Sequence, residues 1–293
     1  MVDSTKERVK MKGPVINNIC YQTGVDVTTW FERNGFNGYD ESRVVSVSHN
    51  RKTGKDEKKT IKGKRYGSRK LTDIRQIMIH HTGGDGDGMG RMYQTLHSER
   101  GLSVHFGVDD DGSIVQLLDC KEKAWHGGKM NKTSIGIECA LFPLVDQNPD
   151  YYSQKRNKRN NNLHHDIMYD VIHGRRYKVF RFTDPQVDSL AHLCASIWYA
   201  VGCELDNDSA VCLHERMLSP VFPRTSGGEI PRTVVENPRE HVGLIGHLHV
   251  TERKIDPAGF PFEKFEKKVA EYFAQMIILG DVPRIPIEIA RMD

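Results

Sequence analysis

The chain has 293 residues, of which 38% are hydrophobic, and this is enough to bury one substantial core with extensions. No run of about 18 apolar residues is present, which excludes a transmembrane helix, and the opening MVDSTKERVKMKG lacks the apolar centre of a signal peptide. The net charge of +3 is slight. None of the six cysteines forms a CxxC pair and no secretion signal is present, so we expect reduced thiols and synthesis in the cytoplasm.

Residues 1–70 are an N-terminal extension of unknown role. Ile16–Trp30 predicts short strands or turns, and NGFNGY at 34–39 has turn chemistry. The end of the extension is basic, because residues 51–70 hold ten Lys or Arg against two acidic residues, an excess of eight. This run is either a solvated linker or a surface for an anionic wall polymer, a membrane surface or nucleic acid.

The stretch IMIHHTGG at Ile77–Gly84 is the first that indicates a site. Its apolar half predicts a buried strand, and Thr82 with two glycines breaks that strand into a loop. Successive side chains of a strand point to opposite faces, so we do not expect His80 and His81 to reach the same site. Alone, the HH pair is more typical of a capped strand end or a hydrogen-bonded core histidine than of a functional site.

A loop, a helix and a β-hairpin are predicted next, at 83–90, 89–100 and 103–118. The loop is rich in Gly and Asp, and Gly101 stops the helix. In the first strand of the hairpin, apolar residues alternate with His105 and Gly107, and DDDG at 109–112 is a strong turn.

The stretch AWHGG at 124–128 predicts a loop that enters a cleft. Trp125 and His126 are available there to a sugar or a peptide, although Trp125 could equally pack beneath the loop. A strand is predicted at 134–139, with Glu138 on a face otherwise kept small. A glutamate there is costly unless it is paired or solvated, which favours a functional role for Glu138.

Two elaborations are predicted, near 141–183 and 213–240. The first centres on QKRNKRNNNLHH, which is polar and without periodicity and therefore predicts a surface insertion. That this segment lines the substrate groove is a separate hypothesis. Its histidines, His164, His165 and His173, raise the idea of a second metal site, but a flexible Asn-rich loop is a poor scaffold for one. The second elaboration is a loop that contains Pro, Gly and Thr.

Two helices are predicted in the last third of the chain. The first runs over 184–201, with Asp184 as N-cap, Pro at the first helical position and Gly202 as the stop. The second runs over 261–279, and both have apolar residues spaced by three and four. We also expect a short strand at 206–212 and no regular structure in the tail, residues 281–293.

The stretch GHLHVTERKIDP at Gly246–Pro257 follows another apolar run, Val242–Ile245, and again puts a histidine at the end of a strand. Alternation leaves one of His247 and His249 for a shared site and favours His247, although a bulge would let His249 compete. Asp256 comes nine positions after His247 (256 − 247 = 9). Two imidazoles and one carboxylate are a known catalytic zinc set that leaves one position for water.

Four strings, in chain order, resemble the zinc-dependent N-acetylmuramoyl-L-alanine amidases: IMIHHTGG, LSVHFGVDDDGSIVQ, AWHGGKMNKTSIGIE and GHLHVTERKIDPAGFPF. That superfamily includes phage lysozyme-type amidases, cytoplasmic anhydromuropeptide-recycling amidases and peptidoglycan recognition proteins. The resemblance spans roughly residues 75–273. It implies an α/β fold in which a central mixed β-sheet is flanked by helices, with zinc in a surface groove of a catalytic domain at 71–280.

The resemblance also implies roles for individual residues. His80, His247 and Asp256 would hold Zn2+, and Glu138 in SIGIE would act as general base and then general acid. Lys254, two residues before Asp256, would stabilise the oxyanion, although a lysine on a surface loop is the alternative.

One departure from the family pattern matters for the mechanism. Members often have a tyrosine where this chain has Val104, and some use its hydroxyl during catalysis. Others use the glutamate that Glu138 matches, so the resemblance points to the glutamate-dependent version. Substrate contacts are expected from Trp125, His126 and His105.

The implied reaction cleaves the amide between N-acetylmuramic acid and L-alanine of peptidoglycan by a zinc-activated water. We favour a lytic role at the bacterial cell wall, as a phage endolysin or a delivered effector, because of the basic run and the enlarged loops. The alternatives are a noncatalytic peptidoglycan-recognition protein, a recycling amidase for soluble muropeptides, and a zinc amidohydrolase redirected to another acylated peptide. Noncatalytic relatives usually lose a metal ligand, whereas all three are present here. We expect peptidoglycan or a muropeptide as partner and no nucleic acid; the sequence does not give the oligomeric state.

Overall fold

The computed structural model describes residues 11–42, 44–50, 53–61, 63–83, 88–153, 165–206, 218–280 and 282–287. The centre of the first predicted insertion, at 154–164, lies outside these residues, as does most of the strand expected over 206–212.

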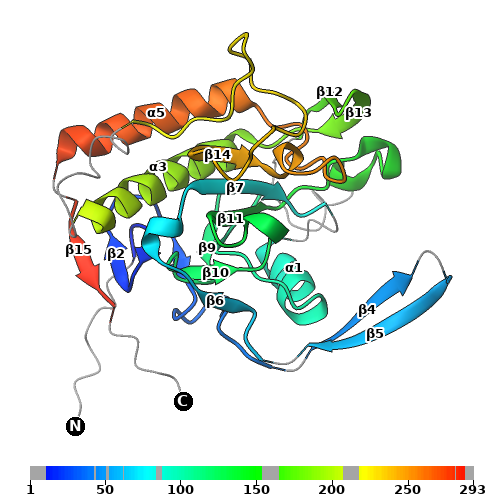
Figure 1. Ribbon diagram of the computed structural model, residues 1–293, viewed down its shortest axis with the longest axis horizontal. Coiled ribbons are helices and arrows are strands. Elements are labelled where there is room, and N and C mark those ends of the chain that lie inside the picture. The colour runs from blue at the N-terminus through cyan, green and yellow to red at the C-terminus, as the bar shows by residue number, and fades with distance from the viewer. Residues whose placement is uncertain are drawn as a thin grey trace.

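A six-stranded mixed β-sheet forms the centre of the molecule (Figure 1). Its strands, in spatial order, are β14 (Gly243–Gly246), β7 (Gln76–His81), β11 (Ser134–Cys139), β8 (Phe106–Val108), β9 (Ile114–Gln116) and β3 (Thr28–Thr29). Only β8 and β9 run antiparallel to each other, joined by the predicted DDDG turn, and all other neighbours are parallel. The buried apolar runs in β7, β11 and β14 fit strands that are covered on both faces.

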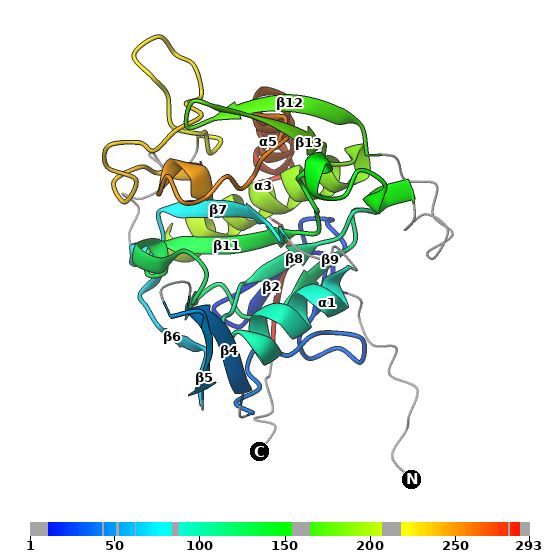
Figure 2. The ribbon, with the colours of Figure 1, turned by 90° about the vertical axis from the view of Figure 1, so that its right-hand side faces the viewer.

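Helices cover both faces of this sheet (Figure 2). On one face lie α3 (Asp184–Asp206) and α5 (Phe262–Leu279), which pack together and bury the apolar stripes that the sequence predicts. On the other face lies α1 (Met89–Tyr93), which continues as a π-helical segment over Gln94–Glu99. The central mixed sheet with flanking helices is confirmed, but α3 does not stop at Gly202 and runs four residues further.

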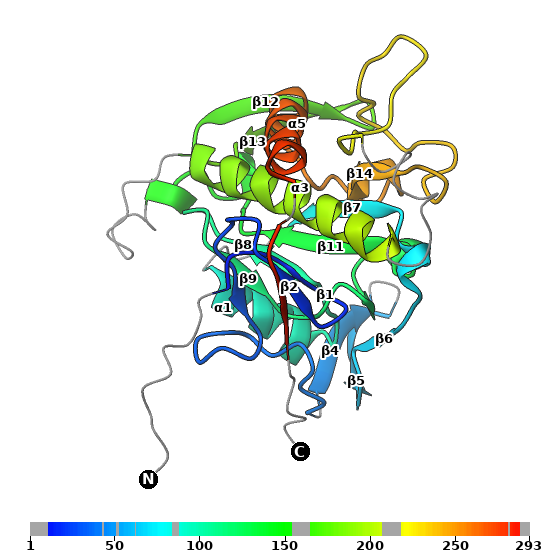
Figure 3. The same cartoon turned by 90° about the vertical axis from the view of Figure 1, so that its left-hand side faces the viewer.

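Smaller sheets surround this centre. The three-stranded sheet β1 (Val15–Ile16), β2 (Ile19–Tyr21) and β15 (Arg284–Pro286) joins the two ends of the described chain (Figure 3), so the expectation of an unstructured tail is wrong. The pair β6 (Tyr66–Ser68) and β10 (Glu122–Ala124) is antiparallel, and β4 (Val44–Asn50) with β5 (Lys55–Ile61) forms a hairpin that projects from the body in Figure 1. Short 3-10 turns lie at Leu71–Asp73, Gly128–Met130, Val145–Gln147 and His247–His249.

The first elaboration contains a hairpin that the sequence analysis did not predict, made of β12 (Ile167–Ile172) and β13 (Arg175–Phe180). Its two-residue turn uses His173 at φ +51° and Gly174 at φ +74°. Positive φ at both turn residues is the geometry that tight hairpins prefer. His165 and His173 lie at opposite ends of this hairpin, so they do not form a shared metal site.

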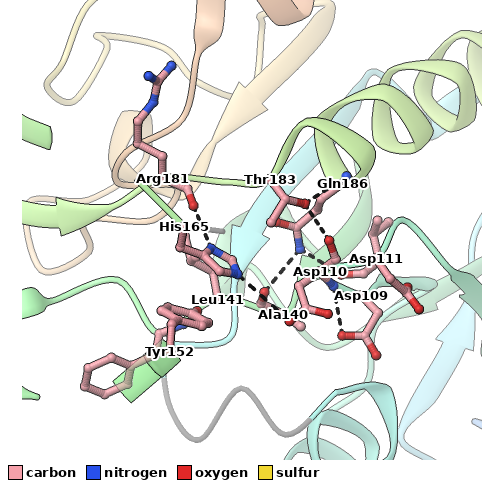
Figure 4. A network of polar contacts seen from close by, with 12 residues as sticks. Asp109, Asp110, Asp111, Ala140, Leu141, Tyr152, His165, Arg181, Thr183 and Gln186 are labelled. Atoms are coloured by element: carbon pink, nitrogen blue, oxygen red, sulfur yellow. Dashed lines mark hydrogen bonds and ion pairs between the residues drawn. The ribbon is translucent and has the colours of Figure 1, made fainter. Parts of the chain in front are cut away.

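A group of buried polar contacts fixes the start of α3 against the edge of the central sheet (Figure 4). The Gln186 side chain donates to the carbonyls of Val108 and Ala140 at 3.2 and 3.1 Å, and the Thr183 hydroxyl donates to the carbonyl of Asp110. The ring of His165 donates to the Arg181 carbonyl at 2.8 Å. These bonds join the β8–β9 turn, the end of β11 and the hairpin to one helix.

Candidate active site

Three neighbouring parallel strands deliver the predicted site residues to one edge of the sheet. In the register of β7 and β11, His80 lies directly beside Glu138. Strand β14 pairs with β7 only as far as Ile79, and His247 follows immediately in a 3-10 turn. Because the carboxyl ends of parallel strands meet at the same edge, residues far apart in the chain come together there.

His80, His247 and Asp256 form a compact group. The Nδ1 atoms of the two histidines are 3.1 Å apart and lie 2.9 and 3.0 Å from Oδ2 of Asp256. All three residues are at most 9% exposed. Burial raises the pKa of Asp256, but hydrogen bonds from both histidines outweigh it and hold this pKa well below its usual range. Burial lowers the pKa of His80 to about 4, so its imidazole is neutral at pH 7.

This donor set fits a zinc ion. One ligand atom from each of the three residues lies within 4.8 Å of the other two, and the set combines two imidazoles with one carboxylate. Zinc in catalytic sites takes such ligands and keeps a fourth position open. The nearby Oε2 atom of Glu138 is buried and has no hydrogen-bond partner within the described chain, which is costly unless something else occupies the pocket.

Glu138 has the electrostatic character of a general base and acid. It is 9% exposed, and burial, with the charge of Asp256, raises its pKa to about 8. The positive charges of Lys254 and Arg100 act in the opposite direction. A carboxyl group that titrates close to neutral pH can both accept and return a proton during one turnover.

A pocket of about 90 Å3 opens over this group. It is lined by His80, His81, Thr82, Arg91, Met92, Thr95, Leu96, Arg100, Leu102, Ser103, Trp125, His126, Glu138, His247, Lys254 and Asp256. Every predicted site residue except His105 therefore lies at the pocket.

His81 departs from the expected alternation. It lines the same pocket as His80, and neither of its ring nitrogens has a hydrogen-bond partner among the described residues. At His80 and His81, β7 still pairs with β11 but no longer with β14, so one side of the strand end is without a neighbouring strand.

His126 lines the pocket and also contacts His80. His80, His247 and Asp256 are called the metal group below, because together they could hold a metal ion. Its Nδ1 lies 3.0 Å from Nε2 of His80, and when Nδ1 of His80 faces a metal, its Nε2 must carry the proton and donate to His126. The His126 ring packs on Gly136 of β11, where a Cβ atom would lie 2.5 Å from the ring. Only glycine at this position leaves room for the ring.

His105 lies outside the pocket, which corrects the expectation that it contacts substrate. It is fully buried, its Nδ1 accepts the Gly136 amide at 3.0 Å, and its Nε2 lies 2.9 Å from the Glu122 carbonyl. Both ring nitrogens are therefore used within the protein. Burial lowers the pKa of His105 to about 3, with the charge of Arg69 adding to the effect.

Both ring nitrogens of His249 also face backbone groups of the protein, as those of His105 do. It lies in the turn after β14 and not on a strand, so the alternation argument does not apply there. Its Nδ1 accepts the Gly246 amide at 2.9 Å, and its Nε2 lies 2.8 Å from the Pro231 carbonyl. His247 is the member of this pair that joins the metal group.

Two arginines at the pocket were missed from the sequence. Arg91 and Arg100 come from the segment that follows the Gly- and Asp-rich loop, and Arg91 is paired with Glu99 at 2.6 Å. Nothing in their local sequence separates them from the other basic residues among 42 Lys and Arg. Only the packing of α1 across the sheet brings them to the site.

Comparison with known proteins decides the family. The family model described as N-acetylmuramoyl-L-alanine amidase matches residues 70–259, which is more than half of the chain. The chain belongs to this amidase family. It is an enzyme that acts on the amide of peptidoglycan. The search of curated proteins found no match. In the described parts of the chain, no helix is both long and apolar enough to cross a bilayer.

Solved structures show only distant likeness to the amidase. The N-acetylmuramoyl-L-alanine amidase LysC from Clostridium intestinale URNW is 14% identical, with 83% of this chain and 97% of that chain covered at a TM-score of 0.37. The hydrolase AmiA of Staphylococcus aureus, in complex with its ligand, is 15% identical, with 71% of this chain and 76% of that chain covered at a TM-score of 0.37. AmpDh3 of Pseudomonas aeruginosa, in complex with anhydromuramic pentapeptide, is 15% identical, with 67% of this chain and 60% of that chain covered at a TM-score of 0.38.

Proposed function

We propose that this amidase is a zinc-dependent lytic enzyme that cuts the bond between N-acetylmuramic acid and L-alanine in the bacterial cell wall. The observation that carries the proposal is the buried group of His80, His247 and Asp256, with Glu138 beside His80 on the next strand. The basic run at 51–70 and the two elaborations support action on a polymer.

The roles of the residues follow from their positions. His80, His247 and Asp256 would hold zinc, which when bound supplies a Lewis acid and lowers the pKa of water to about 7. His126 keeps the ring of His80 in the orientation that turns Nδ1 toward Asp256.

Glu138 takes a proton from the attacking water and gives it to the amide nitrogen as the carbon–nitrogen bond breaks, so that the lactyl carboxylate and the L-alanine amine are the products. Lys254 lines the pocket and stabilises negative charge on the carbonyl oxygen, an effect of about 3 to 4 kcal/mol for one such donor.

The test is a mass-spectrometric digest of purified sacculi and of soluble muropeptides by the zinc-loaded enzyme and by Glu138→Ala. We expect the wild type to release stem peptides with a free L-alanine amine from sacculi, and the variant to lose roughly a hundredfold or more in rate. Cleavage of soluble muropeptides alone would replace the lytic role with a recycling role. Binding of sacculi without release would leave a recognition protein.

A further inference from the structure

A second hollow lies beside the loop that carries Lys254. It has a volume of about 210 Å3 and is lined by His173, Arg175, Tyr177, Thr233 and Glu252. These residues come from the β12–β13 hairpin, from the second elaboration, and from the turn that leads to Asp256. The two elaborations of this chain therefore meet at one place, and that place adjoins the active-site loop (Figures 1 and 2).

The hollow is held by fixed contacts on both sides of Asp256. The ring of His173 donates to the carbonyl of Lys254 at 2.9 Å, and the amide of Gly259 donates to the buried carboxylate of Asp170 at 2.9 Å. The backbone amide of His173 also donates to the carbonyl of Arg232 at 2.9 Å. The hairpin is thus tied to both ends of the segment that presents Asp256, which makes the hollow a rigid feature.

The hollow lies on the inner face of the β12–β13 hairpin. Arg175 and Tyr177 alternate with Arg176 along β13 and lie on the same face as Val179, which is fully buried. Ile172, which lies opposite Arg175 in the register, is also fully buried, so this face packs on the core, and Arg175 and Tyr177 line the hollow at the border of that core. Arg176 lies on the outer face, with its guanidinium 3.8 Å from the centre of the Tyr169 ring.

The polar groups in the hollow are available to a ligand. The side chains of Arg175, Tyr177 and Glu252 make no hydrogen bond or ion pair with any part of the chain that the structure describes. They offer a guanidinium, a phenol hydroxyl and a carboxylate, whose formal charges sum to zero. This balance disfavours an anion or a cation and suits a neutral ligand with both donors and acceptors, such as an N-acetylated saccharide.

The position of the hollow relative to the catalytic pocket indicates which saccharide this is. Glu252 lines the hollow and Lys254, two residues later, lines the pocket, so a ligand that follows this loop reaches both. We propose that the hollow is a subsite for the glycan strand next to the muramoyl residue whose amide is cut. The proposal rests on the proposed function, and it makes the polymer the preferred substrate over a single muropeptide.

Binding of chitohexaose, a neutral β-1,4-linked N-acetylglucosamine hexamer, tests the subsite without any hydrolysis. Titration calorimetry should show that Arg175→Ala weakens binding about tenfold, because a charge-assisted hydrogen-bonding group is lost. Arg176→Ala removes the same group from the opposite face of the same strand and should leave the Kd unchanged. Polyphosphate serves as the anionic probe, and its binding should not depend on Arg175.

Three outcomes would overturn the subsite: no binding of chitohexaose by the wild type, equal Kd values for the two arginine variants, or loss of polyphosphate binding alone in Arg175→Ala. Kinetics supply the second readout. Arg175→Ala should raise KM for glycan strands carrying stem peptides and leave kcat and the hydrolysis of single-sugar muropeptides unchanged. If the wild type cleaves nothing, the proposed function fails, while the calorimetry still decides the subsite.

Discussion

His105 and His249 differ from His80 and His247 in what faces their ring nitrogens. Each of the first two accepts a glycine amide on Nδ1 and has a backbone carbonyl at Nε2, so its tautomer and position are fixed. The second two turn Nδ1 toward one oxygen of Asp256. The same side chain thus ties backbone segments together in one case and, in the other, joins a group that could hold a metal ion.

The largest expected effect comes from removing the acceptor that the metal-group histidines share. Asp256→Ala should abolish zinc binding and lower kcat/KM on muropeptides by at least about a thousandfold, because two imidazoles alone do not hold the ion. Zinc content of the purified protein and peptide release are the measurements. Circular dichroism should show an unchanged fold, and full zinc occupancy in the variant would show that the ion is held elsewhere.

A smaller effect is expected from disturbing the partner of His80. Gly136→Ala places a Cβ atom 2.5 Å from the His126 ring, which must move away from His80, and kcat/KM should fall about tenfold. Gly90→Ala is the matched control, because its Cβ would meet nothing nearer than 3.8 Å. Equal activity of both variants would mean that His126 does not orient His80.

The histidines with backbone partners should show the opposite behaviour. His249→Leu leaves the Gly246 amide and the Pro231 carbonyl without partners and should lower the free energy of unfolding by about 2 to 3 kcal/mol in urea titrations. Zinc content should stay the same. Loss of zinc at unchanged stability would instead place His249 in the metal group.

The smallest expected effect concerns pH. The folded-state pKa of His105 is about 3, below its unfolded value near 6.5, so the stability it contributes is complete above pH 6.5 and is lost as pH falls toward 3. Between pH 7.5 and 5, this group should account for about 1 to 2 kcal/mol of lost stability. His105→Gln should flatten the pH dependence of urea unfolding by that amount, and an unchanged slope would contradict it.

Much of the sheet and its helices could be predicted from local patterns. These are the apolar runs at 77–79 and 242–245, the alternation at 134–139, and the apolar stripes at 184–201 and 261–279. Residues of the metal group could be named from ordered motifs. The position of His105 could not, because it depends on which backbone groups need a hydrogen-bond partner in the folded chain.

The β12–β13 hairpin was missed for a different reason. Its outer face carries Ile167, Tyr169 and Val171, which are about half exposed, so the usual pattern of polar residues facing solvent is absent. The hairpin also follows the polar stretch at 154–164, whose composition predicts a loop. The basic β4–β5 hairpin was likewise taken as a possible linker, because charge alone does not indicate pairing.

The pairing of β2 with β15 has a consequence for the order of folding. Cys20 lies opposite Ile285, so this contact closes almost the whole chain into one loop and can form only after the last strand is synthesised. The strands that deliver the metal group all precede β15. During synthesis, strands β7, β11 and β14 can therefore assemble before β15 exists. The sheet of β1 and β2 is completed only when β15 has been made.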